Sequence, residues 1–157
     1  MNVEIEEVVM QNWNQGRSLD AGRVLFENVP RGLRPFWAVR ILDLIYTRMR
    51  LNIISPETEK VIACAQNHPE WTRAKEVFRP VRRKVLELEK SGKSGFELSL
   101  LMLSELTAKI TYNETEPFDE FDEDTGWYFL KDAIMLTDMI EDRQLSLIIW
   151  DALFGRT

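Results

Sequence analysis

Residues 96–112 read FELSLLMLSELTAKITY, and this stretch decides the fold. If it is helical, its apolar side chains point in nearly every direction around the helix axis: Leu98, Leu100, Leu101, Met102, Leu103, Leu106 and Ile110. A helix that is hydrophobic on all sides is buried among other elements, whereas a surface helix keeps one polar side. We therefore expect residues 96–112 to form the central helix of an all-α protein.

The segments on either side of this stretch carry apolar residues at alternating three- and four-residue steps, which is typical of amphipathic helices. The pattern predicts helices over residues 3–14, 36–50, 70–90, 125–140 and 143–154, with shorter helices beginning near Ser18 and Ser55. It leaves open whether the last two helices are one bent helix. No segment shows a sustained strand alternation. The predicted fold is all-α, a compact bundle of about six to eight amphipathic helices in a single domain, residues 1–157.

Local signals refine the helix ends. Ser55, followed by a proline and a glutamate, is a strong helix start, and Ser18 is predicted to cap the helix that follows it. Ser94 and Glu97 match the capping box, in which a hydroxyl at N-cap and a carboxylate at N3 satisfy the first amides. Pro80 is expected to kink or split the helix over residues 70–90. On the first helix, the apolar side is expected to carry Val3, Val8 and Trp13.

The composition is that of an ordinary globular protein, with 45% apolar and 29% charged residues. Cys64 is the only cysteine, so an intrachain disulfide is excluded, which fits a reducing compartment. The first residues carry carboxylates rather than the basic region of a signal peptide. No apolar run approaches the roughly 18–20 residues of a membrane span. We expect a soluble cytoplasmic protein that needs no cofactor and has no membrane partner.

Charge is divided unevenly along the chain. Residues 1–93 carry 16 Lys and Arg against 12 Asp and Glu, whereas residues 94–157 carry 4 against 14. The extremes are a basic stretch, residues 73–93, and an acidic segment, residues 114–124, in which seven of eleven residues are carboxylates. Clustered like charge repels itself and steers charged partners. We expect the arginines of the basic stretch to pair with the acidic segment, and the acidic total disfavours non-specific binding of nucleic acid.

One pair of residues raises the question of nucleophilic or metal chemistry. Cys64 and His68 are four residues apart and would share a face of one helix, as a thiolate–imidazole pair or half of a zinc site requires. His68 is the only histidine, however, and it precedes Pro69, which places it beyond the end of the helix. Cys64 is therefore expected to be a small buried apolar residue.

Helical carboxylates are a second candidate for metal chemistry. Glu4 and Glu7, and likewise Asp138 and Glu141, have the spacing of the paired carboxylates that hold magnesium in all-α nucleotide pyrophosphohydrolases. No phosphate-binding motif accompanies either pair. Solvent-exposed helix faces explain both pairs, so we expect no metal site here.

The acidic segment is a third candidate, because calcium binds carboxylate oxygens. When Glu120, Asp122 and Asp124 are aligned with the first three ligands of an EF-hand, Gly126 comes one residue late. Lys131 then stands where the bidentate glutamate belongs, so the segment fails the calcium-loop rule.

Two aromatic residues within the acidic segment suggest a different role. Phe118 and Phe121 would be unusual in a free acidic tail, so we predict that the segment folds back toward the basic stretch with both rings in apolar grooves. Exposed ion pairs contribute only about 0–1 kcal/mol each, so the rings must supply most of the stabilisation. Phe121→Ala should therefore speed limited proteolysis near residue 120 more than Asp122→Asn does.

The function favoured by these patterns is a small, non-enzymatic protein-interaction or regulatory module with an acidic carboxyl-terminal half. A toxin-neutralising immunity protein is one concrete member of that class, because acidic surfaces suit capture of cationic proteins. The expected partner is a protein, either one with a basic surface or a second copy of the chain in a homodimer. The alternatives are a metal-dependent hydrolase that uses helical carboxylates and a nucleic-acid binder that uses residues 73–93. The residues predicted to bind the partner are Glu116, Phe118, Asp119, Glu120, Phe121, Asp122 and Asp124.

Overall fold

The computed structural model describes residues 1–48, 55–93, 95–116, 124–139 and 143–156. These ranges contain eight α-helices, two short 3-10 helices and no strand, which confirms the all-α prediction. The α-helices are α1 (Val3–Asn14), α2 (Ser18–Glu27), α3 (Arg34–Arg48), α4 (Pro56–Gln66), α5 (Ala74–Lys90), α6 (Phe96–Asn113), α7 (Thr125–Met139) and α8 (Arg143–Leu153). The 3-10 helices are η1 (Arg31–Leu33) and η2 (His68–Arg73).

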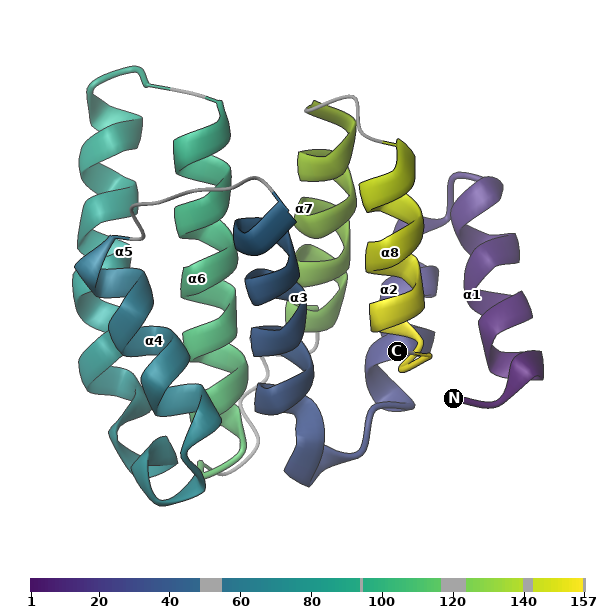
Figure 1. Cartoon of the computed structure of the whole chain (residues 1–157), viewed down its shortest axis with the longest axis horizontal. Helices are drawn as coiled ribbons and strands as arrows, with labels where there is room; N and C mark the ends of the chain where they lie inside the picture. The colour runs from purple at the N-terminus through teal and green to yellow at the C-terminus, as the bar shows by residue number, and fades with distance from the viewer. Residues whose placement is uncertain (49–54, 94, 117–123, 140–142, 157) are drawn as a thin grey trace.

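The helices form a bundle in which α6 has the central place that its sequence predicts (Figure 1). It packs against α3, α4, α5 and α7. The pair α4 and α5 lies on one side of α6, and α1 and α2 lie at the opposite end of the bundle. Between them, α3 and α7 pack on α8. No helix of the described residues is both long enough and apolar enough to cross a membrane.

The all-round apolar surface of α6 is explained by two separate clusters of buried side chains. Leu100, Leu103 and Ile110 belong to the larger cluster, which α6 shares with α1, α2, α3, α7 and α8. Leu101 and Ala108 belong to a smaller cluster with residues of α4 and α5. The helix is apolar on nearly every side because it contributes to a core on both sides.

Two glycines set the approach of α2 to α7. A Cβ added at Gly22 would lie 2.4 Å from the Cα of Trp127, and one added at Gly126 would lie 2.3 Å from the side chain of Phe26. Real Cβ atoms essentially never come so close to another heavy atom. The two helices therefore touch at positions where no larger residue fits.

The helix ends confirm one predicted cap and correct another. The Ser55 hydroxyl accepts a hydrogen bond from the amide of Thr58 at 3.2 Å, as predicted. The cap predicted at Ser18 is wrong, because Arg17 is the N-cap of α2 and its side chain makes no capping bond. The Ser18 hydroxyl instead accepts a hydrogen bond from the Trp127 indole at 3.3 Å. The Ser18 hydroxyl thus binds a residue more than one hundred positions away instead of capping its own helix.

The remaining end signals concern α5 and α6. Ser94 lies outside the described residues, and the N-cap of α6 is Gly95, with φ 109° and no side-chain capping bond. The predicted helix over 70–90 begins later, at Ala74, because η2 occupies the preceding turn. Pro80 lies inside α5 without splitting it. Pro80 has no amide hydrogen and is exposed, so the helix loses one hydrogen bond on the side where water can replace it.

The buried side of α1 differs from the prediction. Val9 is fully buried and Glu6 is nearly so, whereas Val3 and Val8 are exposed. Ile5, Val9 and Trp13, spaced four residues apart, face the larger cluster, so the prediction is right for Trp13. Glu6 lies beside this stripe and forms an ion pair with Arg156, beyond the end of α8.

The two last helices, which the sequence left as one or two, are separate. α7 ends at Met139, α8 begins at Arg143, and the two pack against one another side by side (Figure 1). Residues 140–142 between them lie outside the described part of the chain.

Candidate functional site

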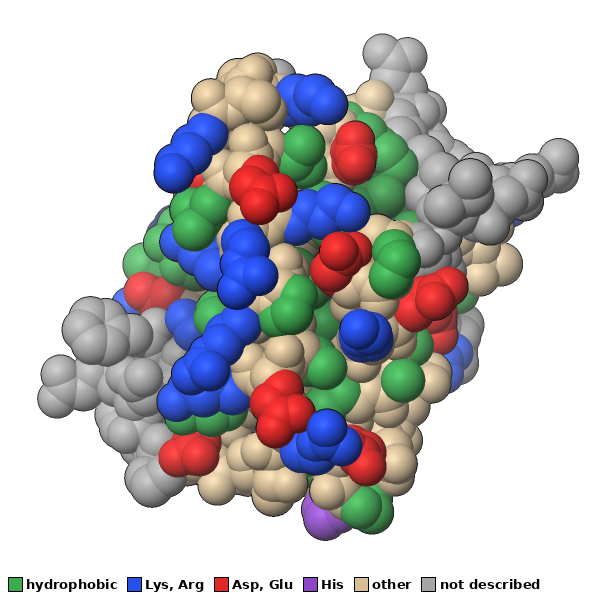
Figure 2. Space-filling view, turned by 90° about the vertical axis from the view of Figure 1, so that its left-hand side faces the viewer, with side chains coloured by type: hydrophobic (Ala, Val, Ile, Leu, Met, Phe, Trp, Pro, Cys, Tyr) green, Lys and Arg blue, Asp and Glu red, His purple; other side chains and the backbone are tan. Residues whose placement is uncertain are grey.

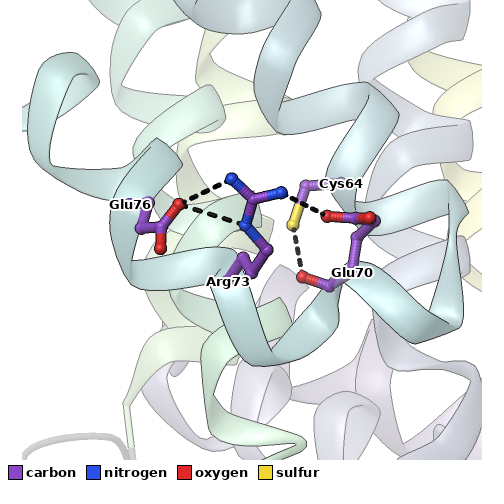
Figure 3. Close-up of polar contacts among 4 residues, drawn as sticks. All are labelled: Cys64, Glu70, Arg73 and Glu76. Atoms are coloured by element: carbon purple, nitrogen blue, oxygen red, sulfur yellow. Dashed lines mark hydrogen bonds and ion pairs between the residues drawn. The ribbon is translucent and has the colours of Figure 1, made fainter.

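The Cys64 thiol lies among polar groups of Glu70 and Arg73, and its geometry does not favour reactivity (Figure 3). α4 ends at Gln66, so His68 lies in η2, off the helix that carries Cys64, and its ring packs on Trp71. The thiol donates to the carbonyl oxygen of Glu70 at 3.2 Å. Burial, followed by the nearby charge of Glu70, raises the pKa of the Cys64 thiol. The thiol therefore stays protonated at neutral pH, and the expected structural role is the one that the geometry supports.

Arg73 forms ion pairs with two carboxylates beside Cys64. Its guanidinium contacts the Glu70 carboxylate at 3.3 Å and the Glu76 carboxylate at 3.0 Å, as Figure 3 shows. These three side chains and Cys64 line a hollow of about 550 Å³. Its arginine is already engaged by two carboxylates and its thiol stays protonated, so neither of these two groups is available to react with a ligand.

The candidate metal ligands do not come together in the described part of the chain. Within it, no group of three or more His, Cys, Asp or Glu residues could hold a metal ion. Glu4, Glu7 and Asp138 are exposed, and Glu141 lies outside the described residues. Glu120 and Asp122, which the calcium alignment used, lie outside them as well.

Two carboxylates that the sequence did not single out lie near one another between α6 and α7. Burial raises the pKa of Asp132 to about 6, and the charge of Glu105 also raises it, against the charge of Lys131. Burial also raises the pKa of Glu105, although Arg82 pairs with it at 2.9 Å. Their shared burial comes from the crossing of two helices, which no spacing along the chain reveals.

The basic stretch finds partners close by, on α4, α5, α6 and η2. Besides the pairs of Arg73, Arg82 pairs with Glu105, and Lys84 pairs with Glu57 at 3.4 Å. Figure 2 looks at the side of the bundle where α4 and α5 lie, and its Lys and Arg side chains are interspersed with Asp and Glu side chains. Arg79 and Arg83 are exposed there and make no ion pair within the described residues.

The described ends of the acidic segment lie near arginines of α2 and the α2–α3 connection. Asp124 pairs with Arg23 at 3.0 Å. At the other end, burial raises the pKa of the Glu114 carboxyl group. The charges of Arg34 and Arg31 lower it, but by less. Glu116 is exposed. The other predicted partner-binding residues lie outside the described part of the chain, so docking of the segment stays a prediction: Phe118, Asp119, Glu120, Phe121 and Asp122.

An open groove with a volume of about 780 Å³ runs along α3. One wall comes from η1 and the outer side of α3, and the other comes from the carboxyl-terminal end of α8. Its apolar lining includes Val29, Pro30, Leu33, Phe36, Trp37, Leu44, Leu153 and Phe154. Leu33 is 54% exposed and Phe36 is 39% exposed, which is unusual for large apolar side chains that lie together.

The walls of this groove are fixed by specific hydrogen bonds. The Trp37 indole donates to the carbonyl oxygen of Leu153 at 3.0 Å, which joins α3 to the end of α8. Arg34 donates to the carbonyl oxygens of Val29 and Phe26 at 3.0 and 3.1 Å, which holds the connection from α2 to α3. The groove is therefore formed before any ligand arrives, which lowers the entropic cost of binding.

Two charged residues stand on the α3 wall. Arg40 is exposed, and Asp43, one turn further along, is half-buried. Asp43 makes no ion pair or hydrogen bond within the described residues, and burial raises the pKa of its carboxyl group. The groove thus combines an apolar floor with one carboxylate that lacks a partner.

The sequence contained part of the signal for this groove. Trp37 and Leu44 belong to the apolar stripe predicted for the helix over 36–50. Leu33 stands between Pro30 and Pro35, in a region that the sequence indicates to be a turn, and Phe36 begins the predicted helix. Large apolar residues in a turn point to a contact beyond the turn itself, but only the position of α8 makes the groove.

Comparison with known proteins gives no relative: no family model, no curated protein and no solved structure matches the chain. Its function therefore has to be argued from its own surface.

Proposed function

We propose that this protein is a non-enzymatic interaction module that binds an apolar segment of a partner protein in the groove between α3 and the end of α8. The observation that carries the proposal is the exposure of Leu33 and Phe36 beside one another on the rim of that groove. Contiguous exposed apolar surface in a soluble fold is typical of a protein-binding site. Grooves between helices are a common place for such contacts.

The walls support the same proposal. The bonds from Trp37 to Leu153 and from Arg34 to Val29 hold the groove open at its ends. Sites for small molecules are usually concave enough to bury most of the ligand's surface, whereas this groove lies open along α3. This openness favours a protein segment as the ligand.

A comparison of captured proteins tests the proposal. The immobilised protein is exposed to an extract of the native organism, beside a Leu33→Ser/Phe36→Ser variant and a Leu147→Ser control. Leu147 is 67% exposed and does not line the groove, so the control removes exposed apolar surface elsewhere. We expect a partner that the parent and the control both retain and the groove variant loses. Equal capture by all three proteins would contradict the proposal.

A second candidate, binding of nucleic acid or another polyanion, has one observation in its favour. Arg79 and Arg83 lie one turn apart on the exposed side of α5 and have no ion pair within the described residues. Acidic side chains interspersed on the same face weaken the field (Figure 2). Binding of a labelled oligonucleotide that falls steeply with salt and is lost in Arg79→Gln/Arg83→Gln would favour this candidate.

A further inference from the structure

The groove also carries information on the kind of segment that it fits. One wall is formed by Leu33 of η1, followed by Phe36, Arg40, Leu44 and Thr47 along one side of α3. From the first to the last of these residues the wall is about 21 Å long, at a rise of 1.5 Å per residue. A helix of about fourteen residues, or an extended strand of about six, spans that length.

The backbone of the occupant decides between these two forms. An extended segment leaves its N–H and C=O groups to be paired by its binding site, usually by the edge of a sheet. The walls here are mostly helices, whose backbone groups are already paired within each helix. The amides of the lining residues just beyond the ends of α2 and α8 are paired with the last turns of those helices. A helical occupant satisfies its own backbone and offers one apolar face, as helix-in-groove recognition requires.

The charge of the groove adds a second requirement. Asp43 is half-buried beside Leu44 and has no ion pair or hydrogen bond within the described residues. An apolar occupant would remove still more water from this carboxylate, which is unfavourable unless a cation faces it. Arg40 is exposed on the same wall and makes no ion pair there with Asp43, so it does not fulfil that role.

We propose that the groove takes an amphipathic helix of a partner protein, three to four turns long, that carries a lysine or arginine opposite Asp43. This inference rests on the proposed function, because it names the form and the charge of the segment that the groove would bind. It also agrees with a partner of basic character, for which the acidic total of the chain is electrostatically suited.

The test uses a displayed library of sixteen-residue peptides with leucines at helical spacing and all other positions random. Peptides selected on the parent protein are synthesised with a fluorescent label, and their affinity is measured by anisotropy. We expect enrichment of one Lys or Arg next to the leucine stripe. We expect Asp43→Lys to weaken binding by about tenfold or more, and a peptide with Glu in place of that cation to bind Asp43→Lys better than it binds the parent.

The outcomes separate the two proposals. If Leu33→Ser/Phe36→Ser abolishes peptide binding but the charge exchange has no effect, the inference about the cation is overturned and the interaction groove stands. If no peptide is enriched, or the enriched peptides bind the groove variant as well as the parent, both proposals fail. If the parent sediments as a dimer that Phe36→Ser dissociates, a second copy of the chain is the occupant and the inference is overturned. Circular dichroism and thermal unfolding of each variant show that it is folded.

Discussion

The two sides of α6 are stabilised in different ways. On one side, the described residues of α1, α2, α3, α7 and α8 join α6 in a cluster of 21 buried residues, several of them aromatic. On the other side, α4 and α5 share only five buried residues with α6, and most of these are small or β-branched. We call these the large-core side and the small-core side.

Hydroxyl groups add polar contacts to the apolar ones on the small-core side. The Ser55 hydroxyl donates to that of Thr58 at 3.0 Å, and the Thr58 and Ser104 hydroxyls are 2.9 Å apart in the interior between α4 and α6. Ser104 in turn donates to the carbonyl oxygen of Leu100 at 3.0 Å. Burial raises the pKa of the Tyr46 phenol, from α3, against the influence of the Thr58 and Ser104 hydroxyls, which lower it. A chain of hydroxyls thus accompanies the small apolar cluster between α4 and α6.

The difference indicates which helices resist local unfolding and which unfold locally more easily. Buried apolar contacts stabilise the large-core side, which also holds the groove. The small-core side buries less apolar surface, so its helices should open locally at lower free energy. The proposed binding site thus lies on the side that should move least.

The largest expected effect compares two leucines of α6. Leu103→Ala should lower the free energy of unfolding by about 2–5 kcal/mol, since the side chain is fully buried in the large cluster and its removal leaves a cavity. Leu101→Ala should cost about 2 kcal/mol, at the lower end of that range, because the small cluster can close around the gap. Urea titration of both variants measures the difference. Equal losses would contradict the distinction between the two sides.

The next effect concerns the close contact within the large-core side. Gly126→Ala should destabilise the protein by about 1–3 kcal/mol, since the new methyl group would overlap the side chain of Phe26. Gly32→Ala is the matched control, because a Cβ there meets nothing within 4 Å. Thermal unfolding should separate the two alanine variants clearly. A neutral Gly126→Ala would mean that α2 and α7 pack less closely than described.

A smaller effect is expected from the hydroxyl chain of the small-core side. Thr58→Val keeps the shape of the side chain but removes its hydrogen bonds to Ser55 and Ser104, at a cost of about 1–2 kcal/mol. Thr72→Val, at an exposed position, is the control and should be close to neutral. Amide hydrogen exchange should speed up in α4 and α5 of Thr58→Val and leave α3 unchanged. Equal acceleration in all helices would show that the two sides open together.

The smallest effect depends on pH and lies where α6 meets α7. The pKa of Asp132 is about 6 in the folded protein, above its ordinary value of 3.8, so the folded state binds its proton more tightly than the unfolded state does. Ionisation of Asp132 therefore costs stability as the pH rises from about 4 to about 6. Asp132→Asn should stabilise the protein at pH 7 by about 1 kcal/mol, after allowance for partial solvent exposure, and leave it unchanged at pH 3.5. Urea titrations at both pH values test this, and a stabilisation of the same size at both would contradict the assigned ionisation.

Most of the helices could be predicted from the sequence because their signals are local. Ser55 caps α4 as expected, since its hydroxyl reaches an amide only three residues away. The central place of α6 followed from its own apolar surface. The sequence predicted only part of one wall of the candidate site, namely the apolar stripe of the helix that carries Trp37 and Leu44.

By itself, then, the sequence determined the fold class, the approximate limits of most helices, and the helix at the centre, because helical periodicity and capping act within a few residues. The tertiary structure alone decided that Glu6 of α1 is buried at an ion pair with Arg156, 150 residues away. It also decided that Ser18 binds an indole instead of capping α2, and that Asp43 lines an apolar groove where none of the described residues forms an ion pair or hydrogen bond with it. Each of these depends on how separate helices meet, and that arrangement is set by long-range packing rather than by the order of residues in any one helix.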